Sequence, residues 1–325
     1  MNFLKLQDEY SDYIGTEYAV TTNTGTSALH LALESFEFNK GDEVIVPQFT
    51  MIASAWAVLY AGLQPVFVDC DDDLLIDIEK IEEAITPGKT KAIMPVHIYG
   101  RICNMTEIMR IANKYDLRVI EDAAEVHGAK WNEQMIGSFD VGCFSFYWNK
   151  IICAEEGGII TTNDKKVYEN ASDMKNMGFG TEHNYLHRKV GFNYRMSNYQ
   201  AGLALNSLRN VNNNLEKRKQ IESWYDEFLR EKYHRSERQV VWVYDINHSH
   251  TDGLVKHLND RGIAARHSFK PMMMQPSFNK SGSPLLWREL NAYKMSIQVC
   301  YLPVSIDLDR EDIKRISDEV NCYEN

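Results

Sequence analysis

One lysine, Lys150, follows the mostly apolar and aromatic stretch CFSFYWN at 143–149. An amine at the end of a hydrophobic strand, partly shielded from water, should have a lowered pKa, which makes it a better nucleophile toward carbonyl groups. The ordinary alternative is a lysine whose stem packs on apolar neighbours while its ammonium group reaches solvent. Glu156, Gly157 and Gly158 come next, and the two glycines favour a tight turn into the following strand.

Two other motifs contain groups that could work together with this amine. In NTGTSALHLAL, Gly25 lets a ligand approach the backbone, and Thr26 opens a helix whose free N–H groups and dipole suit a phosphate. Asp122 ends the apolar run LRVIED, where a carboxylate could hold a proton on a ring nitrogen. A capped helix start and a simple N-cap are the ordinary alternatives for these two motifs. A phosphate site, a partner for a ring nitrogen and an amine are what pyridoxal phosphate requires.

Apolar, β-rich runs alternate with segments of helical period over the first two thirds of the chain. Strands are expected at 42–47, 64–69, 91–97, 117–122, 141–148 and 157–163, with helices such as 26–36 and 105–115 between them. Continuous apolar strands followed by helices indicate an α/β architecture with a mostly parallel sheet covered on both faces. Ligands of such sheets bind outside the carboxyl ends of the strands, which is where the three groups should lie.

The last third of the chain has a different pattern. The polar segment 207–236 is expected to form a long helix that leaves the sheet domain. A strand at 239–246, a helix at 251–262 and a closing helix near 310–320 predict a small α+β domain. The expected domains are therefore 1–205 and 206–325.

Composition excludes several classes of protein. The net charge of −11 over 325 residues would repel an extended phosphate backbone, so nucleic-acid binding is disfavoured. The six cysteines contain no C-x-x-C pair, so neither a metal site nor a disulfide framework is expected, and a reducing cytoplasm fits best. No signal peptide and no run of eighteen apolar residues is present, so we expect a soluble protein without a membrane span.

The sequence resembles the DegT/StrS family of nucleotide-sugar aminotransferases, which are pyridoxal phosphate enzymes of fold type I. The resemblance runs from about residue 10 to 320 and is carried by GTSALHLAL, GDEVIVPQFTMIASAWAV, PVFVDCD, AITPGKTKAIMPVHIYG, VIEDAAEVHGA, FSFYWNK, EGG and GFNYRMSNYQAGLAL, in that order. It implies an aspartate-aminotransferase-like large domain, a smaller C-terminal domain and a homodimer with shared active sites.

The resemblance also implies roles for individual residues. Lys150 would be the Schiff-base lysine and would then shuttle a proton between the amino donor and the cofactor. Asp122 would pair with the pyridine nitrogen, and Glu125 would sit near the ring hydroxyl. The other implied cofactor contacts are Gly25, Thr26 and Ser145 at the phosphate, Asn193 at the phosphate of the neighbouring subunit, and Met51, whose thioether stands where the family often has a stacking aromatic.

The same resemblance indicates the class of sugar substrate. The motifs YWNK and EGG are similar to the branch that aminates C4 of nucleotide-linked 4-keto-6-deoxyhexoses, whereas the C3 branch more often reads PTKNL. L-Glutamate would leave its amino group as pyridoxamine phosphate, and the keto sugar would then take it, giving a viosamine-type or perosamine-type product. Candidate donors to the sugar's diphosphate are His187, Arg195 and Arg266, with surface or dimer salt bridges as the ordinary alternative.

Other functions stay open at this point. A C3 aminotransferase and a non-catalytic regulator would share the fold and the cofactor. A related sugar dehydratase is disfavoured because that branch replaces the lysine with histidine, and this chain keeps Lys150. A nicotinamide-dependent oxidoreductase would need a G-x-G-x-x-G motif after the first strand, and the chain has none there.

Overall fold

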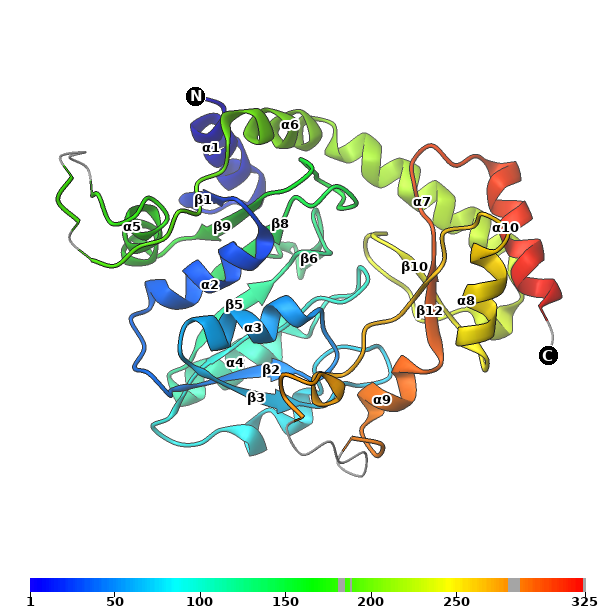
Figure 1. Ribbon diagram of the computed structural model, residues 1–325, viewed down its shortest axis with the longest axis horizontal. Coiled ribbons are helices and arrows are strands. Elements are labelled where there is room, and N and C mark those ends of the chain that lie inside the picture. Colours follow the sequence, from blue (N-terminus) through cyan, green and yellow to red (C-terminus); the bar gives the residue numbers. More distant parts are fainter. Residues whose placement is uncertain (181–184, 188, 280–286, 324–325) are drawn as a thin grey trace.

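The computed structural model describes residues 1–180, 185–187, 189–279 and 287–323. Its main sheet has seven strands in the order β1-β9-β8-β5-β4-β2-β3 (Figure 1). The strands are β1 (Tyr18–Thr22), β2 (Glu43–Pro47), β3 (Gln64–Val68), β4 (Thr90–Ile93), β5 (Arg118–Asp122), β8 (Val141–Ser145) and β9 (Gly158–Thr162). β9 is antiparallel to both of its neighbours, and the other adjacent pairs are parallel. The expected α/β class with a mostly parallel sheet is confirmed.

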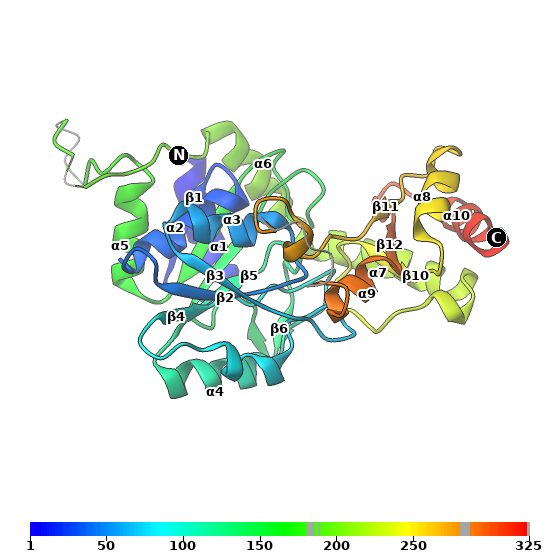
Figure 2. The same cartoon turned by 60° about the horizontal axis from the view of Figure 1, so that its bottom comes forward.

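Helices cover both faces of the main sheet. They are α1 (Asn2–Ile14), α2 (Gly25–Ser35), α3 (Ile52–Tyr60), α4 (Met105–Tyr115), α5 (Lys165–Met174) and α6 (Asn198–Arg209). Alternate residues of β2 point to opposite cores, with Val44 and Val46 beside α2, α3 and α5, and Ile45 beside α1, α4 and α6. Figure 2 shows α4 on the far side of the sheet from α2 and α3. Burial on both faces explains why these strands read as continuous apolar runs.

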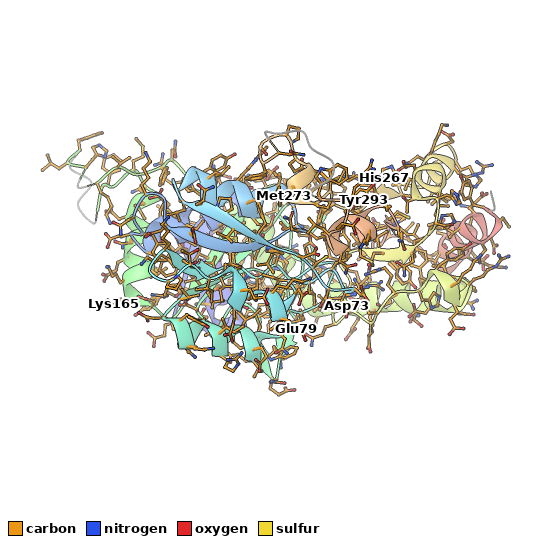
Figure 3. The ribbon with its side chains drawn as sticks, turned by 90° about the horizontal axis from the view of Figure 1, so that it is seen from below. Asp73, Glu79, Lys165, His267, Met273 and Tyr293 are labelled. Carbon is orange, nitrogen blue, oxygen red and sulfur yellow. The ribbon has the colours of Figure 1, made fainter. Side chains whose placement is uncertain are left out.

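A second, three-stranded sheet lies beyond the main one. Its strands β10 (Tyr244–Asn247), β11 (Arg266–His267) and β12 (Val299–Leu302) have the order β10-β12-β11, and α7 (Val211–Phe228), α8 (Thr251–Asn259) and α10 (Arg310–Cys322) pack with it in a separate core. The remaining elements are the hairpin β6 (Lys130–Trp131) and β7 (Gln134–Met135), α9 (Asn291–Ser296), and the short 3₁₀ helices η1 (Ile78–Lys80), η2 (Glu82–Ala84), η3 (Glu231–Tyr233) and η4 (Met272–Met274). Lys165 of α5 and His267 of β11 lie at opposite ends of the molecule (Figure 3).

The helix α7 connects the two sheets. Val211, in its first turn, belongs to the core of the main sheet, whereas Ile221 and Tyr225 belong to the core of the small sheet. The expected domain boundary between residues 205 and 206 falls inside α6 and stays a prediction. Within the described residues, no helix combines the length and the apolar character that a bilayer span requires.

Several expected elements have different bounds in the structure, and three of them differ most. The strand expected at 91–97 ends at Ile93, and Pro95, which has no N–H to donate, lies just beyond it. The long helix expected at 207–236 is the end of α6 followed by α7, with a break at Asn210. The strand expected at 239–246 begins only at Tyr244, because Gln239 and Val240 donate to the backbone of Gly100 instead of a neighbouring strand.

Candidate active site

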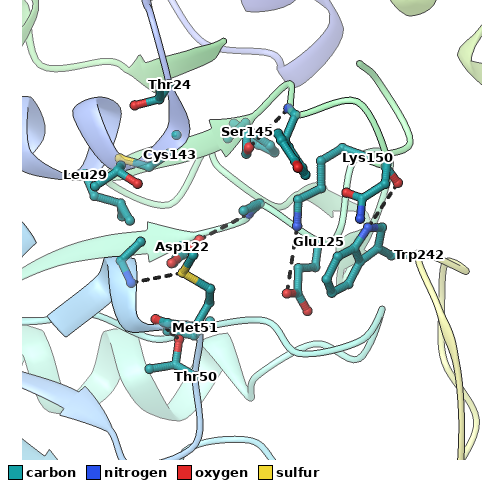
Figure 4. A pocket seen from close by; sticks show the side chains of 18 of the residues that line it. Thr24, Leu29, Thr50, Met51, Asp122, Glu125, Cys143, Ser145, Lys150 and Trp242 are labelled. Carbon is teal, nitrogen blue, oxygen red and sulfur yellow. Dashed lines mark hydrogen bonds and ion pairs between the residues drawn. The ribbon is translucent and has the colours of Figure 1, made fainter. Parts of the chain in front are cut away.

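A cavity of about 490 Å³ lies where β5 and β8 end. Its lining includes Gly25, Thr26, Met51, Asp122, Glu125, Ser145, Lys150 and Arg266 from the sequence-based candidates, together with Trp242, Phe269 and Tyr301 from the chain beyond residue 205. Figure 4 shows Lys150, Glu125 and Trp242 on one side of the cavity, and Asp122 and Met51 on another. Parts of the chain far apart in sequence therefore meet at one cavity at the strand ends, as expected for an α/β sheet.

The first turn of α2 forms one end of the cavity. Thr24 caps this helix, its hydroxyl accepting a hydrogen bond from the Ser27 N–H at 3.0 Å. A Cβ at Gly25 would stand 2.7 Å from the Cβ of Ser145, and one at Gly158 would stand 2.4 Å from the backbone oxygen of Thr24. Only glycine allows β8 and β9 to approach the helix so closely. The site offers free N–H groups, the positive end of a helix dipole and the hydroxyls of Thr26 and Ser145, which suits a phosphate.

Asp122 stands at the end of β5 and is buried. Its Oδ2 accepts a hydrogen bond from the Ser54 hydroxyl at 2.7 Å, and its Oδ1 accepts one from the Ala124 N–H at 3.3 Å. Burial raises the pKa of Asp122, and these two bonds offset the effect only in part. No ion pair among the described residues involves this carboxylate. A protonated ring nitrogen placed in the cavity would supply the cation that it lacks.

Lys150 and Glu125 form a buried pair. The Nζ of Lys150 is 3.9 Å from Glu125 Oε1, and the two side chains are 10% and 5% exposed. Burial lowers the pKa of Lys150, the direction expected from its sequence context, although Glu125 and Asp122 act against it. Burial also raises the pKa of Glu125 to about 8, even though its Oε2 accepts a hydrogen bond from the Tyr99 N–H at 2.8 Å. Burial therefore disfavours the charged form of both side chains, and each charge partly offsets that effect on the other.

The loop at 146–157 presents the lysine to the cavity. Phe146 donates its N–H to Gly157, and its own carbonyl accepts from Ala154, at 2.9 and 2.7 Å. Lys150 donates its N–H to the carbonyl of Tyr147 at 2.9 Å. Gly157 has a φ of 152°, and a Cβ there would stand 2.2 Å from the side chain of Met196. The glycine is required for the tight return of the chain into β9.

Three candidates lie outside the cavity of their own chain. Asn193, His187 and Arg195 are exposed and belong to the segment between α5 and α6. The Nη1 of Arg195 donates to Asn176 Oδ1 at 3.0 Å, and the Nδ1 of His187 donates to the carbonyl of Met177 at 2.7 Å. Their predicted binding roles therefore stay predictions.

Several residues of the site have no sequence signal. Ser54, in α3, reaches Asp122 from 68 positions away. His127 is buried between the Tyr10 hydroxyl and the backbone oxygen of Ser145, both at 2.9 Å, and burial lowers its pKa to about 3. Its neutral ring therefore donates to Ser145 and fixes that residue at the cavity. Met51, which was already a candidate from the sequence, is the N-cap of α3, and its sulfur accepts from the Ala53 N–H at 3.1 Å while its side chain stays half exposed.

Comparisons with known proteins agree with this geometry. The model of the DegT/DnrJ/EryC1/StrS aminotransferase family matches residues 2–321. GDP-perosamine synthase of Caulobacter vibrioides is 38% identical over 96% of this chain and 87% of its own length. A dTDP-3-amino-3,6-dideoxy-alpha-D-galactopyranose transaminase of Aneurinibacillus thermoaerophilus is 32% identical over 97% and 88%. The crystal structure of DesV from S. venezuelae, in complex with a ketimine intermediate, superposes with a TM-score of 0.91 at 30% identity, covering 99% of this chain and 88% of that one. The chain is a member of the DegT/DnrJ/EryC1/StrS aminotransferase family.

Proposed function

We propose that this chain is a pyridoxal phosphate-dependent aminotransferase that moves an amino group from L-glutamate to C4 of a nucleotide-linked 4-keto-6-deoxyhexose. The observation that carries the proposal is the meeting of the buried Lys150 amine, the buried Asp122 carboxylate and the first turn of α2 around one cavity. These are an amine, a ring-nitrogen partner and a phosphate site, and family membership supports the same reading.

The residues present fit the cofactor. The first turn of α2, with Gly25, Thr26 and Ser145, would hold the phosphate, Asp122 would face the ring nitrogen, and Glu125 would lie near the ring hydroxyl. Met51 would lie against the ring, where its thioether can pack on a π face. When bound, pyridoxal phosphate supplies an aldehyde that can bond to an amine and a ring that accepts electrons.

Lys150 would act as base and then as acid. A neutral amine is needed to accept a proton from the α-carbon of the donor, and burial favours this neutral form. The ammonium form must then persist until it returns the proton, and the carboxylates of Glu125 and Asp122 favour that form. Because these opposing effects act on one side chain, both protonation states are accessible in the same cavity.

The choice of C4 rests on sequence motifs and on a relative's name. The stretch YWNK is followed by EGG at Glu156–Gly158, and the Caulobacter relative is named as a perosamine synthase. C3 amination is the second candidate, because the Aneurinibacillus relative, of similar coverage, is named as a transaminase that forms a 3-amino sugar.

The proposed assembly is a homodimer with shared sites. Large aromatic side chains are exposed on α3, where Trp56 and Tyr60 are 37% and 55% exposed, and on the loop of Lys150, where Trp148 is 55% exposed. Exposed aromatic side chains are typical of contact surfaces. Burying them against a second copy would also let the segment that carries Asn193, His187 and Arg195 approach the other copy's cavity. The free, mostly buried cysteines fit a cytoplasmic location.

A substrate panel tests the function. Purified protein with pyridoxal phosphate and glutamate is offered nucleotide-linked 4-keto-6-deoxy sugars and their 3-keto counterparts, and products are identified by mass and NMR. We expect one 4-keto sugar to gain an amine at C4. A product aminated at C3 would replace the C4 assignment, and conversion of no sugar would contradict the proposed function altogether.

The role of Lys150 has its own test. Borohydride treatment in the presence of pyridoxal phosphate should attach the cofactor to the peptide that contains Lys150. Lys150→Arg should melt within a few degrees of the wild type but lose about 10³-fold or more in turnover, because the guanidinium cannot act as a base. Labelling at another lysine, or normal turnover by the arginine variant, would contradict this role.

A further inference from the structure

Trp242 forms a wall of the cavity beside Lys150, and none of the roles described above uses it. The Nζ of Lys150 lies 3.5 Å from the centre of the indole ring, well within the roughly 6 Å over which an aromatic face attracts a cation. Trp242 is 5% exposed and the lysine side chain 10% exposed, so little water competes for the ammonium. Figure 4 shows the indole alongside the end of the lysine side chain.

Hydrogen bonds from two directions fix the indole. Its Nε1–H donates to the backbone oxygen of Asn149, the residue before the lysine, at 3.1 Å. Arg218 of α7 donates from Nη1 to the backbone oxygens of Val241 and Trp242, at 3.3 and 3.1 Å. Arg218 is buried and takes part in none of the ion pairs found among the described residues. The indole is thus held to the lysine loop, and the backbone of Trp242 is held to α7.

Filling of the core is the ordinary explanation for a buried tryptophan. Trp242 does belong to the core of the main sheet, and its ring lies 6.0 Å from that of Tyr99 and 6.4 Å from that of Tyr301. A packing role alone needs only apolar volume. It does not need the ring face at the amine or a hydrogen bond to the residue that precedes the lysine.

We propose that Trp242 is a positioning residue that holds the ammonium form of Lys150 against its indole face in the interval between accepting a proton and returning it. The inference rests on the proposed function, because only a lysine that is released and recaptured needs such a resting place. An aromatic face attracts a cation but has no site for its proton. Lys150 can therefore be held close to the reacting carbon and still give its proton to the substrate.

Other charges face the same amine. Glu125 and Asp122 favour the ammonium, whereas Arg218 and burial disfavour it, and Glu156 and Arg266 line the same cavity. Like Glu125 and Asp122, the indole favours the ammonium form of Lys150, but it carries no charge. Removing its face should therefore lower the pKa of Lys150, while removing its volume alone should not.

The first test uses the cofactor-free protein and does not depend on turnover. Acetic anhydride labelling at a series of pH values, read by mass spectrometry of the Lys150 peptide, gives the pKa of that amine. We expect Trp242→Leu to lower this pKa by about one unit and Trp242→Phe to lower it much less. Trp131→Leu is the matched control, since that indole donates to Thr106 at 2.8 Å and does not line the cavity. Should the leucine variant fail to fold, Trp242→Met takes its place, because methionine fills irregular gaps.

The second test measures transfer by the loaded enzyme. Trp242→Leu should lower kcat about tenfold, change KM for either substrate less than twofold and move the acidic limb of the pH profile to lower pH, and Trp242→Phe should restore most of the rate. Equal pKa values for Lys150 in the wild type and the leucine variant would overturn the inference, as would a phenylalanine variant as impaired as the leucine one. Lack of turnover by the wild type would instead contradict the proposed function. The labelling experiment would still test the contact between Trp242 and Lys150, because it needs no turnover.

Discussion

Asp122 must stay ionised if it is to hold a proton on a ring nitrogen, yet its surroundings disfavour the charge. Burial raises the pKa of this carboxyl. The Ser54 hydroxyl, at 2.7 Å from Oδ2, is the side-chain hydrogen bond that most lowers it. Ser54 therefore supports the charged form before a cofactor arrives, although it touches no substrate itself.

We expect Ser54→Ala to weaken binding of pyridoxal phosphate about tenfold, because a hydrogen bond to a charged group contributes about 1.5 kcal/mol. Fluorescence titration of the cofactor-free protein measures this affinity. Ser138→Ala is the control, since that hydroxyl donates to the backbone oxygen of Met135 in the hairpin region and does not line the cavity. Equal affinities for the two variants would show that Ser54 does not support the charge.

Glu125 gives a prediction that depends on pH. Burial raises its pKa to about 8 from the ordinary glutamate value of 4.5, so the folded chain keeps a proton that the unfolded chain has released. The free energy of unfolding should therefore fall as pH rises from about 4.5 to 8. Glu125→Gln cannot titrate and keeps an acceptor for the Tyr99 N–H. Without cofactor, its Tm should exceed that of the wild type by an amount that grows to several degrees across this range. Calorimetry at pH 5 and pH 8 measures the two Tm values. An equal Tm difference between variant and wild type at both pH values would contradict the raised pKa of Glu125.

Residues at the ends of elements were the easiest to predict. Lys150, Asp122 and Gly25 each stand where an apolar run or a helix pattern stops, so their type and place are visible together. Ser54, His127 and Trp242 reach the site from a helix, a loop and a distant segment. A serine, histidine or tryptophan in such a place usually has a structural role, so nothing in the sequence singles these residues out. Their contacts depend on how the sheets pack, and the local sequence contains no such information.

At the scale of elements, the contact between α2 and the strands β8 and β9 shapes the phosphate site. The backbone of Gly158 lies against Thr24 and Gly25, with no room for a Cβ. A side chain there would push β9 away from the first turn of α2, where the free N–H groups converge.

Gly158→Ala should therefore lower the free energy of unfolding by about 3 kcal/mol and also weaken cofactor binding, because backbone atoms cannot move aside as a flexible side chain can. Gly202→Ala in α6 is the matched control, since its Cβ would meet only the flexible side chain of Asn2. Urea unfolding and cofactor titration measure the two effects. A Gly158 variant as stable as the control would show that the strands can separate freely from the helix.

Six of the seven strands of the main sheet were predicted, because burial on both faces gives them continuous apolar runs. The strand β1 was not predicted, since its short run YAVTT ends in two threonines. The segment before β10 was predicted wrongly for a physical reason. Residues 239–243 are as apolar as a strand, but their backbone groups bond to Gly100 and Arg218. Trp242 therefore lies outside the small sheet, and its side chain lines the cavity.

At the scale of the whole molecule, one buried carboxylate connects the two sheets. Asp245 of β10 is fully buried and accepts hydrogen bonds from Arg101 at 3.0 and 3.1 Å and from Arg235 and Arg238 at 2.8 Å each. Arg101 belongs to the loop after β4, and Arg235 also donates to the backbone of Asp72 at 2.7 Å. Asp245 thus joins the small sheet to the main one, three residues after Trp242 in the chain.

Asp245→Asn should lower the free energy of unfolding by about 3–5 kcal/mol at pH 7, because the buried guanidinium groups of Arg101 and Arg235 would lose their counterion and Arg238 would keep only Glu222. Burial alone would raise the pKa of Asp245, but the arginines outweigh it and lower the pKa to about 2. The carboxylate's contribution is therefore complete above about pH 4 and is lost as pH falls through 2. Urea unfolding should show that the difference in free energy of unfolding between wild type and variant becomes smaller as pH falls over that range. Asp260→Asn, which removes an exposed pair with Lys256, should leave the midpoint unchanged. Equal effects of the two substitutions would mean that the sheets are held together by apolar contacts alone.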